Sequence, residues 1–276
     1  MAVFLSLVTA LLYGSGDFLG GLTSRRNSQI QVLITISLIG VAPLWVLAPL
    51  VADSVSLNDV FLGGGAGLAG IGGLGLLYRG LSRGPMSVFA PLTAIVSAAF
   101  PVIWGLARGD QQIFRTWIGI FLGLVGIFTL AFPEHKDGSR LSSSVVYEAI
   151  LAGIGFGLFF ALLSETAAQS APWPIVSGRT SAAVVLLGVA LIRKSAILPT
   201  GGWATLLGCA MCDTGANVAF LFALHYGQLG PVAVLASLYP AATVLLARLV
   251  LREHLTPRRV VGLVFALGAV VLVGLG

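Results

Sequence analysis

The side chains best suited to chemistry in this sequence are a few polar residues set inside long apolar segments. Asp213 and Asn217 are four residues apart, so on a helix they share one face. An ionisable residue inside a membrane is costly and usually faces a cavity or a partner. We therefore expect Asp213 to bind a cationic group or to carry a proton, with Asn217 as an orienting amide. The alternative is a structural cap, or an Asp–Asn pair that clamps two helices.

A second carboxylate, Asp17, lies near the end of the first apolar segment, in the glycine-rich stretch YGSGDFLGG of residues 13–21. Tyr13 and Asp17 share a helical face. Both are candidates for the same substrate cavity as Asp213. The alternative for Asp17 is that it reaches the membrane interface and pairs with Arg25 or Arg26.

The basic residue Arg179 stands inside another apolar segment, about two turns from its start. Its planar guanidinium suits a substrate carboxylate. It could equally pair with Glu165 near the end of the preceding segment. If Arg179 instead pairs with Asp213, both residues become structural or gating residues.

Aromatic and hydroxyl side chains complete the candidate substrate site. Phe156, Phe159 and Phe160 recur at helical spacing, a pattern that packing produces more often than a binding wall does. Ser237 and Tyr239 are candidates for the lining of a cavity.

The sequence carries no motif of hydrolytic, phosphate-binding or redox chemistry, so we predict no enzyme, cofactor or metal centre. Cys209 and Cys212 form a CxxC inside an apolar segment, where two small packing residues are the simpler interpretation. The net charge of +5 does not indicate nucleic acid, because the basic residues are scattered in short loops.

These residues belong to a membrane protein. Apolar residues make up 57% of the 276-residue chain and charged residues only 9%, against about 25% in soluble domains. Continuous apolar runs of about 20 residues must form helices in lipid, because their backbone groups find no water there. We predict an all-α fold of ten transmembrane helices, over residues 2–23, 30–51, 59–79, 85–107, 114–133, 145–166, 173–192, 202–225, 230–251 and 257–275.

The chain divides into two similar halves. A polar stretch over residues 134–144 predicts a linker between a first five-helix repeat, 1–133, and a second, 145–276. Gly84-Pro85 aligns with Gly230-Pro231, together with apolar positions that follow. Because five is odd, the second repeat must enter the membrane from the opposite side. Inverted repeats are a recurrent design of transporters, with the substrate site between the halves near the midplane.

The distribution of basic residues predicts the orientation. The loops after the odd-numbered helices hold most of them: Arg25, Arg26, Arg79, Arg83, Lys136, Arg140, Arg193, Lys194, Arg252, Arg258 and Arg259. The opposite face has only Arg108 and Arg115. Basic residues mark the cytoplasmic side, so we expect an inner (plasma) membrane protein with both termini outside.

Several motifs resemble one family, the EamA-type carriers of the drug/metabolite transporter superfamily. They are Tyr239-Pro240, the stretch LREHLT of residues 251–256, Gly262 and Gly268 in the second half, Tyr78-Arg79, Gly84-Pro85, Val88, Ala90 and Pro91 in the first, and residues 13–21 with Ser24-Arg25-Arg26. The resemblance implies a bundle of two inverted five-helix repeats that moves amino acids, other metabolites or drugs, often outward.

The sequence departs from this family pattern in two ways. Ala107-Arg108 stands where the second half has Glu253-His254, so a glutamate expected after the fourth helix is absent. Many relatives also keep both termini in the cytoplasm, whereas the charges here place them outside.

We therefore predict a secondary transporter, an exporter of small metabolites, amino acids or drugs, that works by alternating access. Its partners are a small-molecule substrate, protons if transport is coupled to them, and the lipid bilayer, and it acts as a monomer or homodimer. The alternatives are a non-transporting scaffold or assembly protein, an intramembrane enzyme without a strong catalytic pair, and a channel without a repeated filter motif.

Overall fold

The computed structural model describes residues 1–24, 26–83, 86–131, 143–250 and 256–275. Within these ranges the regular structure is helical, and it comprises α1 (Ala2–Thr23), α2 (Gln29–Val51), α3 (Leu57–Arg83), α4 (Met86–Ala107), α5 (Phe114–Ala131), α6 (Ser143–Ser164), the short 3₁₀ helix η1 (Ala168–Ser170), α7 (Trp173–Ile192), α8 (Trp203–Leu224), α9 (Leu229–Ala236), α10 (Tyr239–Val250) and α11 (Pro257–Gly274).

Nine helical segments within the described ranges are long and apolar enough to cross a membrane, and α9 and α10 together count as one of them. The described apolar part of α4, Leu92–Ala107, is shorter. Predicted and observed helix ends agree within a few residues. Most of the predicted linker 134–144 lies outside the described residues, as does Glu253-His254, and residues 143 and 144 open α6.

The predicted helix over residues 230–251 is interrupted. The turn at Ser237 and Leu238 separates α9 from α10, and Leu238 donates its N–H to the carbonyl of Leu235 at 3.2 Å, a bond one residue shorter than a helical one. The cause is Pro240, which has no N–H for the carbonyl of Ala236 and whose ring crowds that carbonyl. The sequence pattern showed the apolar length of this segment but not its break.

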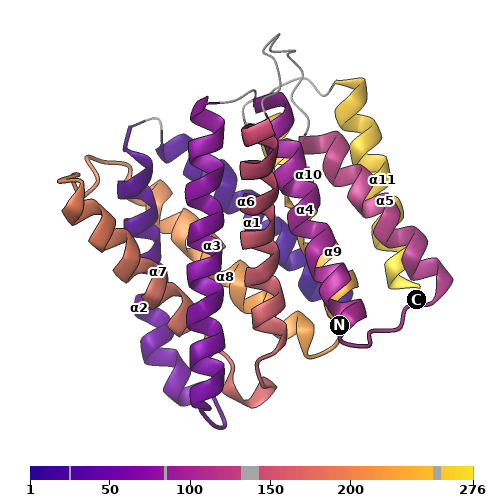
Figure 1. Cartoon of the computed structure of the whole chain (residues 1–276), viewed down its shortest axis with the longest axis horizontal. Helices are drawn as coiled ribbons and strands as arrows, with labels where there is room; N and C mark the ends of the chain where they lie inside the picture. Colours follow the sequence, from indigo (N-terminus) through magenta and orange to yellow (C-terminus); the bar gives the residue numbers. More distant parts are fainter. Residues whose placement is uncertain (25, 84–85, 132–142, 251–255, 276) are drawn as a thin grey trace.

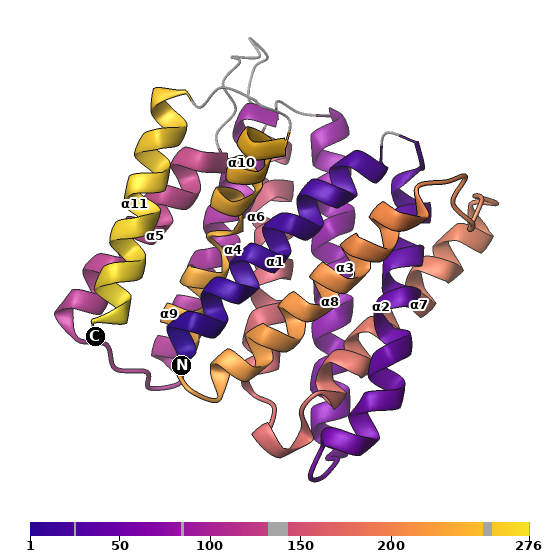
Figure 2. The ribbon, with the colours of Figure 1, turned by 180° about the vertical axis from the view of Figure 1, so that it is seen from behind.

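The helices form one bundle, with α2 and α7 at one side and α5 and α11 at the other (Figure 1). In the middle, α1 packs along α8 and α3 packs along α6. Seen from behind, α1 and α8 run side by side at a marked tilt (Figure 2). The largest apolar cluster gathers residues from both halves of the chain, including Val41 from the first half and Phe160 and Phe220 from the second.

Two helix crossings require glycine. A Cβ atom at Gly14 of α1 would lie 2.6 Å from the Cβ of Ala242 and 2.6 Å from the carbonyl oxygen of Tyr239, both on α10. A Cβ atom at Gly67 of α3 would overlap the backbone of Gly178 on α7. Small residues let helix backbones approach in this way in membrane bundles.

Contacts between the halves close both ends of the bundle. At one end, the Asn27 carboxamide accepts from the N–H of Thr200 at 2.7 Å and donates to the carbonyl of Gly201 at 3.0 Å. At the other end, where both termini lie (Figure 1), buried Asp59 accepts from the hydroxyl of Ser170 at 2.5 Å and from the N–H of Ala167 at 3.2 Å.

Candidate functional site

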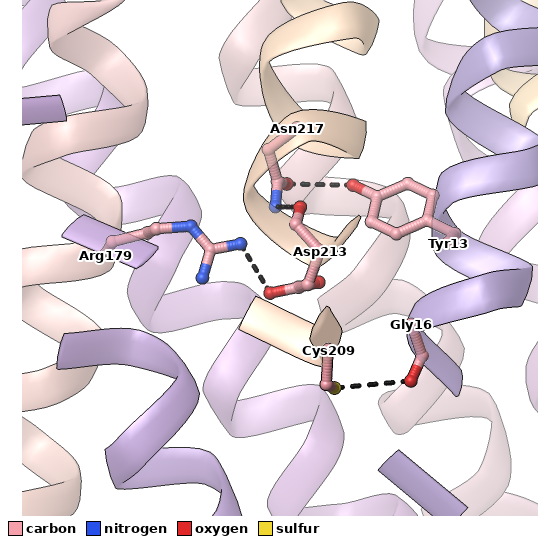
Figure 3. Close-up of polar contacts among 6 residues, drawn as sticks. All are labelled: Tyr13, Gly16, Arg179, Cys209, Asp213 and Asn217. Atoms are coloured by element: carbon pink, nitrogen blue, oxygen red, sulfur yellow. Dashed lines mark hydrogen bonds and ion pairs between the residues drawn. The ribbon is translucent and has the colours of Figure 1, made fainter. Parts of the chain in front are cut away.

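A chain of polar contacts crosses the middle of the bundle from α1 to α7. The hydroxyl of Tyr13 on α1 donates to Oδ1 of Asn217 on α8 at 2.8 Å, and Nδ2 of Asn217 donates to the backbone carbonyl of Asp213 at 2.7 Å. The Asp213 carboxylate then accepts from Nη2 of Arg179 on α7 (Figure 3). This series of polar contacts therefore joins one helix of the first half of the protein to two helices of the second half.

The partner of Arg179 is Asp213, not Glu165. The Arg179 side chain is 10% exposed and that of Asp213 is 33% exposed. The expected alternative pair with Glu165 is wrong, because Glu165 is held by Arg108 and Trp104. Of the sequence-based alternatives for Arg179, the internal ion pair is the one that the structure has.

Asp213 and Asn217 do share a face of α8, but they interact differently from the clamp considered above. Asn217 bonds to the backbone carbonyl of Asp213, so its amide leaves the carboxylate free for Arg179. The same amide accepts from Tyr13, which fixes its orientation. This arrangement suits an orienting role for Asn217.

Aromatic rings pack on one side of the polar chain. The ring of Tyr13 meets the rings of Phe160 and Tyr239 edge-on, with centroids 6.4 and 6.3 Å apart. The ring centroid of Phe160 in turn lies 4.4 Å from that of Phe220 and 5.4 Å from that of Phe159. Tyr239 thus reaches the candidate site directly, and Phe159 lies one ring further out.

The backbone of Phe156 lies where α6 meets α3. A Cβ atom at Gly73 of α3 would lie 3.2 Å from the backbone nitrogen of Phe156. Phe159 approaches α3 in the same way, with its ring 3.5 Å from such an atom at Gly70. Both residues therefore lie where α3 packs on α6, and a role in binding stays a prediction.

Asp17 lies one turn beyond Tyr13 on α1 and is exposed. Within the described ranges it forms no hydrogen bond or ion pair, and Arg26 is not its partner; Arg25 lies outside those ranges. Its neighbour Gly16 packs against α8, and the carbonyl of Gly16 accepts from the Sγ of Cys209 at 3.2 Å. Cys209 thus holds α1 to α8, as a packing residue would.

Ser237 lies at the break between α9 and α10 and is 2% exposed. Its hydroxyl has no hydrogen-bond partner among the described residues. A buried hydroxyl without a partner is costly unless another group satisfies it. The position therefore remains a candidate for contact with substrate or water.

Sequence reasoning missed a second polar group, at the end of the bundle that bears the termini. The Glu165 carboxylate accepts from the indole N–H of Trp104 at 2.9 Å and from Nη2 of Arg108 at 2.5 Å. These contacts join the end of α4 to the end of α6. Glu165 lies 61 positions from Trp104 and 57 positions from Arg108, so no spacing pattern connects it to them.

Comparison with known proteins agrees with this architecture. A solved structure described only as "Crystal structure of protein" is similar over 99% of this chain and 96% of its own, with a TM-score of 0.80 and 16% sequence identity. At that identity the likeness shows a shared fold. No curated protein matches the chain. Residues 142–275 match the model of the EamA-like transporter family. The second half of the chain is therefore similar to the EamA-like transporter family, part of the drug/metabolite transporter superfamily.

Proposed function

We propose that this protein is a secondary transporter that moves small metabolites, amino acids or drugs across the membrane. The similarity to this family supports transport in general. The observation that carries the proposal is the ion pair of Arg179 with Asp213 inside the bundle, in which Asp213 keeps a third of its side chain exposed. Charged groups are retained at such depth when they serve a substrate, an ion or a proton.

Helix packing supports two inverted five-helix repeats, 1–133 and 145–276, joined through 134–144. In such a fold α1 corresponds to α6, α2 to α7, α3 to α8, α4 to α9 and α10 together, and α5 to α11. If each helix is replaced by its counterpart in the other repeat, the contact of α1 with α8 becomes the contact of α6 with α3. The structure has both of these contacts. The contact of α4 with α6 likewise has its counterpart in α1 with α9 and α10, and α2–α7 and α5–α11 are their own counterparts.

Alternating access in this arrangement rocks one repeat against the other around the polar chain. A positive group of the substrate, or a proton, competes with Arg179 for Asp213, and a negative group competes with Asp213 for Arg179. Tyr13, Tyr239 and Ser237 line the same region in this proposal. Asp17 is exposed and lies one turn from Tyr13. Because a carboxylate facing lipid would be unstable, its exposure supports a water-lined route toward the end of the bundle that bears Arg26.

The transport direction in this proposal is outward, across the inner (plasma) membrane. The end of the bundle with Arg26, Arg193 and Lys194 then faces the cytoplasm, and both termini face outside. Membrane vesicles of known sidedness are treated with a protease added from outside. The loops that the protease cuts test this assignment independently of flux.

The proposed function is tested by screening amino acids and small metabolites for thermal stabilisation of the purified protein, followed by counterflow in proteoliposomes. Asp213→Asn is the test variant and Asp53→Asn, an exposed carboxylate in the loop before α3, is the matched control. We expect a stabilising compound to show counterflow that Asp213→Asn abolishes and Asp53→Asn preserves. Equal flux in both variants would remove Asp213 from the mechanism, and no flux with any stabilising compound would favour a scaffold.

A further inference from the structure

A cavity of about 330 Å³ opens at the end of the bundle that bears the termini. It lies between the ends of α4, α6 and α8 and the start of α9. Its polar lining comes mainly from Trp104, Arg108, Asp110, Glu165 and Gln228. The Arg179–Asp213 pair contributes nothing to this lining, so the cavity is separate from the candidate transport site.

The charges of the lining do not balance. Asp110 and Glu165 bring two carboxylates against one guanidinium, that of Arg108. Arg108 is bound to Glu165 at 2.5 Å, and Glu165 also accepts from Trp104 at 2.9 Å. Glu165 is therefore satisfied within the protein, and the negative charge of Asp110 is left over.

Asp110 occupies a position where a carboxylate is unfavourable. The residue follows the C-terminal end of α4, and its backbone N–H donates to the carbonyl of Gly105 at 2.9 Å. Its Oδ2 atom is buried against Gly105, where a Cβ atom would overlap it, and no hydrogen-bond donor among the described residues reaches it. The end of a helix carries partial negative charge, which favours a cation at this place.

We propose that the cavity binds an organic ammonium ion, with the ammonium group at Asp110 and the apolar part against Trp104. An ammonium supplies up to three donors, and Asp110 is the carboxylate of the lining that no guanidinium holds. The indole of Trp104, stacked on Phe100 with centroids 6.1 Å apart, offers a face for an attached apolar group and for cation–π attraction. The cavity volume is at the lower end of the range for small-molecule sites.

The lining chemistry argues against a metal ion as the occupant. Hard cations such as Ca²⁺ take about six to eight oxygen ligands. Here Glu165 is occupied by Arg108 and Trp104, and the side-chain oxygen of Gln228 already accepts from Gln112. Asp110 alone does not form a metal shell, whereas it is enough for one charge-assisted hydrogen bond.

The test is a titration of the purified protein with benzylammonium chloride, with binding measured calorimetrically and as a shift in melting temperature. Benzyl alcohol serves as the uncharged control ligand, and NaCl and CaCl₂ serve as inorganic controls. We expect binding of benzylammonium alone, weakened about tenfold or more by Asp110→Asn, since a lost factor of ten corresponds to about 1.4 kcal/mol. Asp53→Asn, on the same end of the bundle, leaves the affinity unchanged.

A second variant moves the carboxylate without removing its charge. The added methyl group of Gly105→Ala displaces Asp110 Oδ2, while Gly72→Ala adds a methyl where nothing lies within 4 Å. We expect Gly105→Ala to weaken benzylammonium binding as Asp110→Asn does, and Gly72→Ala to leave it unchanged. The proposal is overturned if benzylammonium does not bind, if Asp110→Asn binds it normally, or if Na⁺ or Ca²⁺ stabilises the protein equally. Because binding is measured without flux, failure here leaves the transport proposal standing, and the reverse holds too.

Discussion

Arg179 on α7 and Asp213 on α8 form an ion pair that is buried on one side only. The Arg179 side chain is 10% exposed, while that of Asp213 is 33% exposed. The guanidinium is thus fixed in the protein interior, and the carboxylate beside it remains open to a further partner. This asymmetry makes Asp213 the member of the pair that another charged group can reach.

Neutralising Asp213 should destabilise the fold as well as stop transport. Asp213→Asn leaves the buried Arg179 without a counter-charge, which costs about 3 kcal/mol, the low end for a broken buried pair because Asp213 is partly exposed. Chemical unfolding in detergent micelles measures this loss. An unchanged free energy of unfolding would mean that Arg179 finds another partner.

Removing both charges separates stability from function. The double variant Arg179→Met, Asp213→Leu should recover most of the stability lost in Asp213→Asn, because apolar replacements of a buried pair are often neutral. In counterflow the double variant should remain inactive. Recovery of flux together with stability would show that the pair is structural.

The Tyr13 hydroxyl should matter modestly for stability. Tyr13→Phe keeps the edge-on ring contacts with Phe160 and Tyr239 but removes the 2.8 Å hydrogen bond to Asn217. The expected loss is about 1 kcal/mol in the free energy of unfolding, the typical net value of one hydrogen bond. Phe222→Leu, outside the polar chain, serves as the comparison for general loss of aromatic packing. A loss in Tyr13→Phe of several times the predicted value would show that the hydroxyl holds more than Asn217.

The crossing of α1 and α10 should not tolerate a methyl group. Gly14→Ala places a Cβ 2.6 Å from two atoms of α10, one of them a backbone oxygen, so the helices must separate. We expect a loss of about 1 to 3 kcal/mol, as for other overpacked sites. Gly21→Ala on the same helix meets nothing within 4 Å and should have no such cost. Equal melting temperatures for the two variants would contradict the packing described for α10.

His225, just after α8, should make stability depend on pH. Burial lowers its pKa from the usual value, and its Nε2 atom has no hydrogen-bond partner among the described residues. The unfolded chain, with a pKa of about 6.5, therefore takes up a proton first as pH falls. The free energy of unfolding should decrease below about pH 6.5, by less than about 1.4 kcal/mol per pH unit, and stay level above it.

The variant His225→Phe keeps a ring beside Phe222, whose centroid is 5.3 Å from that of His225, and removes the titration. Unfolding measured from about pH 7.5 to about pH 5.5 compares the two proteins. If the free energy of unfolding falls equally with pH in both proteins, the pH dependence belongs to other groups.

The lengths of the apolar segments and the positions of the helix-breaking residues between them were enough to place most helices. The predicted segment 173–192 coincides with α7, whose start is marked by Pro172 and Pro174, and 2–23 coincides with α1. Burial of backbone groups in lipid forces these runs to be helical, so their limits follow from where polar residues begin. The interruption between α9 and α10 could not be read in the same way, because Pro240 can kink, start or break a helix and the packing of its neighbours decides which.

The candidate site was predictable by residue type but not by partner. Asp213, Asn217, Tyr13 and Arg179 stood out because polar groups are rare in apolar segments. Which carboxylate Arg179 meets depends on how α7 packs against α6 and α8, and the sequence left Glu165 and Asp213 open. Glu165 is taken by Arg108, a residue that the sequence showed only as a basic residue on the outer face.

Accessibility of the polar region from both sides of the membrane tests the central claim most directly. In a Cys209→Ala, Cys212→Ala background, which removes both native cysteines, Ser237→Cys places one thiol at the break between α9 and α10. A membrane-impermeant thiol reagent is then added to right-side-out and to inside-out vesicles, with Asp53→Cys as a one-sided control. The account predicts labelling of Ser237→Cys in both preparations, since each state of the transporter opens the site to one side. Labelling from neither side, or from one side alone, would contradict it.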